Sequence, residues 1–97
     1  MIVHFEWAGS CTWIQFTDSN YEEWCGIFGQ GTVATANSAL VNTKGICFVI
    51  AHGQGYLINI NSRQLLHKIE NDWLISVVSI PEKDVFVVCD WTNLSLI

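Results

Sequence analysis

The second half of the chain, from Gly45 to Ile97, is a series of short apolar segments separated by residues that favour tight turns. Branched and aromatic residues dominate each segment, as is typical of β-strands. Segments of about six residues are too short for helices, which need about ten residues or more. The sequence therefore predicts strands at Ile46–Ala51, Gly55–Ile60, Gln64–Ile69, Trp73–Ile80, Asp84–Trp91 and Leu94–Ile97.

The gaps between these segments contain residues that reverse a chain for known reasons. Gly53 and Gly55 can adopt positive φ, and the side chains of Asn61 and Asn71 can hydrogen-bond to the neighbouring backbone. Pro81 cannot donate a hydrogen bond within a central strand, so a turn is expected there. Successive strands joined by such turns form a β-meander.

The first half of the chain is less regular. Ile2–Trp7 and Thr12–Phe16 are expected to be strands that form a hairpin, and Thr32–Ala36 is expected to be another strand. Tyr21–Phe28 is undecided, because Asn20 favours the start of a short helix whereas two glycines limit its length. The stretch after Ala36 is either a loop or the end of the preceding strand.

Two segments of the meander are apolar at both odd and even positions. Trp73–Ile80 and Val85–Cys89 have this pattern, which is typical of strands that are covered on both faces. A single sheet open to water would alternate instead. We therefore predict one all-β domain over residues 1–97, built of antiparallel β-meander sheets that are propeller-blade-like or sandwich- or barrel-like.

Three segments carry a resemblance to a known family. Cys25–Gly31 reads CGIFGQG, Gly53–Ile58 reads GQGYLI, and Val88–Leu94 reads VCDWTNL. With these segments the chain resembles an uncharacterised bacterial β-propeller-like family, and it is similar to the short proteins encoded on integron gene cassettes. The resemblance implies sheets arranged like blades, with about two blades in this length, and it implies no particular activity.

Composition limits the partners of the chain. Hydrophobic residues make up 51% and charged residues only 13%, a sparse charge for the surface of a small monomer. We therefore predict a homo-oligomer, most simply a dimer, in which Leu94–Ile97 has no partner in its own chain and meets a neighbouring one. The net charge of −5 with four cations argues against nucleic acid as a partner. The sequence shows neither a signal peptide nor a membrane span, so a cytoplasmic location is expected.

The residues that usually carry chemistry do not form recognisable motifs. The four cysteines lack the spacing of a zinc site and are expected to be reduced, with Cys47 and Cys89 buried inside strands. The three histidines follow no metal-binding pattern, and no nucleophile elbow or phosphate loop is present. We therefore expect no catalytic residues, no cofactor and no metal.

The tryptophans offer a second interpretation. Five indole rings in 97 residues can pack in the core, or they can stack on a carbohydrate or another small ligand. Candidate ligand-binding residues are Trp13, Trp24, Trp91 and His52, the last because it borders a glycine turn. The leading hypothesis is a non-enzymatic interaction module that self-associates, and the alternatives are a small-ligand binder and an acidic, immunity-type inhibitor of a basic protein.

Overall fold

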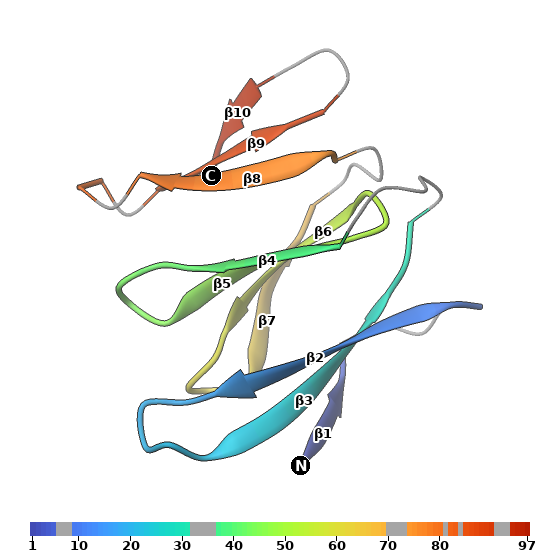
Figure 1. Ribbon diagram of the computed structural model, residues 1–97, viewed down its shortest axis with the longest axis vertical. Helices are drawn as coiled ribbons and strands as arrows, with labels where there is room; N and C mark the ends of the chain where they lie inside the picture. The colour runs from blue at the N-terminus through green and yellow to red at the C-terminus, as the bar shows by residue number, and fades with distance from the viewer. Residues whose placement is uncertain (6–8, 32–36, 70–73, 81, 84, 91–93) are drawn as a thin grey trace.

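The protein forms ten strands and no helix within the residues that its computed structural model describes, which are 1–5, 9–31, 37–69, 74–80, 82–83, 85–90 and 94–97 (Figure 1). The all-β prediction is therefore confirmed. The strands are β1 (Ile2–His4), β2 (Cys11–Thr17), β3 (Glu23–Gly29), β4 (Ser38–Val41), β5 (Ile46–Ala51), β6 (Gln54–Asn59), β7 (Gln64–Lys68), β8 (Ser76–Ile80), β9 (Val85–Cys89) and β10 (Leu94–Leu96).

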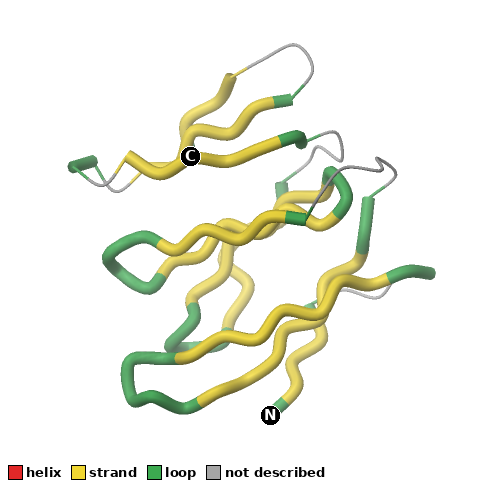
Figure 2. The backbone as a smooth tube through the Cα atoms, viewed as in Figure 1, coloured by secondary structure: helices red, strands yellow, loops and turns green. Residues whose placement is uncertain are grey.

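The strands form three sheets that lie one on another as layers, as the tube in Figure 2 shows. The N-terminal sheet has the strand order β1-β3-β2, the central sheet β4-β5-β6-β7, and the C-terminal sheet β10-β9-β8. Neighbouring strands in the central and C-terminal sheets are antiparallel and consecutive in sequence, as a meander requires. The meander prediction is therefore confirmed for the second half of the chain.

The N-terminal sheet differs from the expected hairpin. β1 pairs with β3 in parallel, and β2 pairs with the opposite edge of β3 in antiparallel. The first two strands are therefore not neighbours, and the predicted hairpin between them is wrong. Residues 6–8 of the first predicted strand, and the predicted strand at 32–36, lie outside the described residues.

The undecided stretch Tyr21–Phe28 is largely strand β3 rather than helix. Asp18 Oδ1 accepts hydrogen bonds from the backbone N–H groups of Asn20 and Glu22, at 2.9 and 3.0 Å. These bonds close a turn between β2 and β3, where a helix cap would instead begin a helix. The chain then alternates, with Trp24 and Phe28 directed into the core from β3.

The central sheet is covered on both faces, which explains its uniformly apolar sequence. On one face, Cys47, Val49 and Tyr56 pack in a core cluster with Phe16 and other aromatic residues of the N-terminal sheet. On the other face, Phe48 and Ile50 pack with residues of the C-terminal sheet. The side chains of β5 alternate between these two clusters, so five of its six residues are buried.

Aromatic rings dominate the first of these clusters. Phe5 stacks on Phe28 with ring centroids 5.0 Å apart, and Phe28 meets Tyr56 of the central sheet at 5.1 Å. The polar atoms of the buried rings have partners, since Tyr56 Oη donates to Gly29 O at 2.6 Å and Trp24 Nε1 donates to Ile60 O at 3.0 Å. These bonds join the N-terminal and central sheets, and they satisfy the polar groups of these two buried rings.

Tight turns join the strands where the sequence predicted them. The β5–β6 turn contains His52 and Gly53 at positive φ, and the β6–β7 turn contains Arg63 at φ 61°. Asn59 Oδ1 accepts hydrogen bonds from the backbone N–H groups of Asn61 and Ser62, both at 3.0 Å. The turn expected at Asn71 lies outside the described residues, as do Pro81 and Asp84 of the β8–β9 turn.

The C-terminal segment is paired within its own chain, in contrast to our expectation. Leu94 and Leu96 belong to β10, which lies antiparallel to β9. Ile97 exchanges two backbone hydrogen bonds with Phe86, both at 2.9 Å, and packs against the second core cluster. The prediction that Leu94–Ile97 lacks a partner in its own sequence is wrong, because the segment completes the C-terminal sheet.

Candidate functional site

The structure separates the residues that the sequence suggested for ligand binding. Trp13 and Trp24 lie on neighbouring strands but on opposite faces of the N-terminal sheet. Trp13 is 62% exposed on the outer face, whereas Trp24 is 2% exposed and packs in the core. His52 lies in the β5–β6 turn of the central sheet, and Trp91 lies outside the described residues. These residues do not share one pocket among the described parts of the chain.

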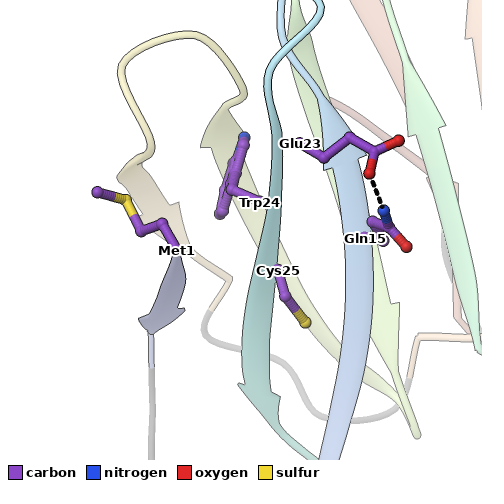
Figure 3. Close-up of a pocket in the computed structure, with 5 residues that line it drawn as sticks. All are labelled: Met1, Gln15, Glu23, Trp24 and Cys25. Carbon is purple, nitrogen blue, oxygen red and sulfur yellow. Dashed lines mark hydrogen bonds between the residues drawn. The ribbon is translucent and has the colours of Figure 1, made fainter.

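A shallow hollow of about 290 Å³ lies at one end of the N-terminal sheet, lined by Met1, Gln15, Glu23, Trp24 and Cys25 (Figure 3). Gln15 Nε2 donates a hydrogen bond to Glu23 Oε2 at 2.8 Å, which holds the two polar side chains together. Cys25 Sγ lies 3.8 Å from Gly26 O, a backbone carbonyl that is no proton acceptor for catalysis. This hollow therefore has no pair of groups arranged for nucleophilic or acid–base chemistry.

A second hollow, of about 350 Å³, lies where the β2–β3, β4–β5 and β6–β7 turns approach one another. Beside it, Arg63 Nη2 lies 3.1 Å from Asp18 Oδ2 and 3.3 Å from Glu22 Oε2. The pKa of Asp18 is lowered, chiefly by the backbone N–H of Glu22, then by that of Asn20 and by Arg63, while burial acts in the opposite direction. The arrangement ties a turn of the N-terminal sheet to a turn of the central sheet.

Metal ligands do not gather either. Among the described residues, no group of three or more His, Cys, Asp or Glu side chains is close enough to hold a metal ion. All four cysteines are free thiols, and burial raises the pKa of Cys47 to about 12. Cys47 is buried as predicted, whereas Cys89 is only half-buried. The same described residues contain no helix long and apolar enough to span a membrane.

The outer face of the C-terminal sheet exposes a row of aliphatic side chains. In a row across the sheet, Val87 in the middle strand lies between Val78 and Leu96, and opposed residues in a sheet point to the same side. Val78 is 57% exposed and Leu96 is 71% exposed. The described strands direct eight uncharged residues to this face, which are Ser76, Val78, Ile80, Val85, Val87, Cys89, Leu94 and Leu96.

This surface, which we call the outer aliphatic face, corrects an expectation from the sequence. Trp73–Ile80 and Val85–Cys89 were both predicted to be covered on both faces. In the first segment Val78 is 57% exposed, and in the second only Phe86 and Val88 are buried, where they point toward the central sheet. β9 thus has the composition of a strand that is covered on both faces, like β5, but the described residues cover only one of its faces. The apolar pattern of β9 is visible in the sequence, but the sequence led us to expect the exposed surface at Leu94–Ile97 alone.

Comparison of the chain with protein-family models, with curated proteins and with solved structures returned no match.

Proposed function

We propose that this protein is a non-enzymatic, cytoplasmic interaction module that self-associates through its outer aliphatic face. The observation that supports the proposal is the contrast between β5 and β9. Both strands are apolar at odd and even positions. Among the described strands, however, β5 has a sheet on each side, whereas β9 has a sheet on one side only. A second copy of the chain supplies the missing layer.

The size of the effect follows from the exposed side chains. Val78, Leu94 and Leu96 are 57%, 74% and 71% exposed. Fully burying one such side chain is worth about 1.5 to 3 kcal/mol, so covering the exposed parts of all three contributes about 3 to 6 kcal/mol per copy. Association costs roughly 4 to 15 kcal/mol of lost translational and rotational freedom. Because the two contributions are of similar size, we expect a reversible, concentration-dependent oligomer.

The test is light scattering with a matched pair of lysine substitutions. Val78→Lys places a charge on the outer aliphatic face, and Val41→Lys places the same charge on the edge of the central sheet, where Val41 is 48% exposed. The parent protein and Val41→Lys are expected to exceed the 10.9 kDa mass of one chain as concentration rises, whereas Val78→Lys stays at that mass. A one-chain mass for all three proteins at every concentration would reject the proposal.

One observation favours a second candidate function, the binding of a carbohydrate or another small ligand. The exposed Trp13 lies on the same face as the hydrogen-bonded pair Gln15 and Glu23, so an apolar ring stands beside polar groups. Flat aromatic rings stack on sugar rings, and polar neighbours can bond to hydroxyl groups. Titration with simple sugars, followed by intrinsic fluorescence and compared with Trp13→Ala, tests this alternative. Unchanged fluorescence at millimolar sugar would exclude it.

A further inference from the structure

We infer that self-association takes the form of a closed two-fold dimer, in which the C-terminal sheets of two copies pack face to face. The middle row of the outer aliphatic face consists of Val78, Val87 and Leu96. It lies across the two-fold axis from the same row of the second copy. This inference rests on the proposed function and specifies its partner and geometry. Three surfaces can be considered as partners of the outer aliphatic face: the outer face of the N-terminal sheet, the edges of the C-terminal sheet, and the same face of a second copy.

The outer face of the N-terminal sheet is a poor match for it. That face carries Glu23 and Gln15, both exposed, together with the protruding ring of Trp13. Packing it under a surface of valine and leucine side chains would remove the Glu23 carboxylate from water with only Gln15 as a donor. An ionised carboxylate is costly to bury without sufficient partners. Head-to-tail stacking of copies is therefore disfavoured.

Pairing of sheet edges between two copies does not cover the outer aliphatic face either. A strand added to the free edge of β8 or β10 would satisfy backbone groups, but it would extend the sheet sideways. Val87, in the middle strand, and its neighbours Val78 and Leu96 would remain in water on the flat of the sheet. Only a layer placed over the face covers them.

The outer aliphatic face is complementary to itself. All of its described strand residues are uncharged, so these residues bring no like charges together in two copies even though each chain has a net charge of −5. Val78, Val87 and Leu96 form a continuous ridge across the three strands of the sheet. Packed sheets place such ridges about 10 Å apart with their strands within about 30° of each other. Because the same patch meets itself, the contact is isologous and closes at two copies.

The footprint of the face indicates how tight the dimer is. Three strands spaced about 4.8 Å apart, with up to five residues of about 3.4 Å each, give a face of roughly 14 by 17 Å. Standard stable interfaces bury about 800 Å² on each partner, so this face falls in the weak, transient class. We therefore expect dissociation in the micromolar range or above, and the experiment must cover that range.

The test uses a single new cysteine near the proposed axis. In a background of Cys11→Ser, Cys25→Ser and Cys89→Ser, the buried Cys47 remains and Val87→Cys is introduced. Val87 lies in the middle strand and the middle row, so it faces its own copy whichever way the axis runs. A bismaleimide whose spacer matches the distance of about 10 Å between packed sheets joins two such thiols.

We expect a covalent dimer and no larger species, with at least tenfold less product when Val78→Lys is added. Val41→Cys in the same background is the matched control and should give only the background yield. Leu96→Cys replaces Val87→Cys should the latter unfold, as circular dichroism would report.

The possible failures are distinguishable. In one case, light scattering shows an oligomer while the Val87→Cys variant gives either no cross-linked product or a ladder of products. Either result would overturn the two-fold geometry and leave self-association intact. A one-chain mass together with no cross-linking would overturn both proposals.

Discussion

Replacing Val88 by alanine is expected to destabilise the protein much more than the same change at Val78, because the two residues lie on opposite faces of the C-terminal sheet. Val88 is 2% exposed and packs with Phe48 and Phe86, whereas Val78 is 57% exposed. The substitution removes two methylene equivalents of about 0.8 kcal/mol each. At Val88 the cavity left behind raises the loss to about 2 to 3 kcal/mol, and at Val78 the loss stays below about 1 kcal/mol.

Urea unfolding followed by tryptophan fluorescence measures both changes. The protein should be dilute enough to be monomeric, because the proposed dimerisation would add a concentration-dependent contribution to the free energy of unfolding. For a domain of this size the Val88→Ala loss corresponds to a melting temperature lower by roughly 10 to 20 °C. Equal losses at the two sites, or a larger loss at Val78, would show that the faces of the sheet are assigned wrongly.

Three further predictions concern local packing, acid stability and thiol reactivity. Gly55→Ala should cost about 1 to 3 kcal/mol in urea unfolding, because a Cβ there would lie 2.5 Å from Leu74 Cδ1, whereas Gly9→Ala, with no atom within 4 Å of its Cβ, should have little effect. The lowered pKa of Asp18 means that its carboxylate stabilises the fold fully above pH 3.8, its ordinary pKa, and that this contribution is lost as the pH falls through the lower pKa of the folded state. Melting temperatures measured from pH 6 downward should therefore fall less steeply for Asp18→Asn than for the parent, and parallel curves would contradict the role of this carboxylate. Cys47, whose pKa is raised to about 12 by burial, should react with a thiol reagent at neutral pH only after unfolding, and rapid labelling in the native state would refute its place in the core.

The parts of the fold that sequence predicted are those determined by neighbouring residues. The β5–β6 and β6–β7 turns lie where Gly53 and the polar residues around Asn61 predicted them. The side chain that bonds to the β6–β7 turn backbone is that of Asn59, however, whereas Asn61 Oδ1 accepts a hydrogen bond from the backbone N–H of Ser19. Strands β5 and β6 are apolar segments bounded by those turns, so their pairing in a hairpin follows directly. At these positions the neighbouring residues are sufficient to predict the turn.

The sequence predictions are wrong where residues far apart in the chain determine the structure. The parallel pairing of β1 with β3 joins Ile2 to Cys25, and no local signal distinguishes it from a hairpin between the first two strands. In the stretch that follows Asp18, a turn and a helix start use the same side-chain hydrogen bonds. The strand forms because Trp24 and Phe28 complete the aromatic core, which the sequence alone does not reveal.

The candidate interaction surface was only partly accessible to sequence reasoning. The apolar pattern of β9 was visible, and it predicted a cover on both faces, but periodicity does not say whether a strand's second cover comes from its own chain. The ligand-binding residues could not be grouped from sequence, because Trp13 and Trp24 point to opposite sides of one sheet only when their register is known.

The most direct test of self-association through the outer aliphatic face uses a native residue. Cys89 lies half-buried on that face, and Cys25 lies half-buried on the outer face of the N-terminal sheet. The rate at which each thiol reacts with iodoacetamide is measured by peptide mass spectrometry over a range of protein concentrations. We expect the rate at Cys89 to fall as protein concentration rises through the dissociation constant, while the rate at Cys25 stays constant. Concentration-independent rates at both residues, or protection of Cys25 instead of Cys89, would contradict the proposed interface.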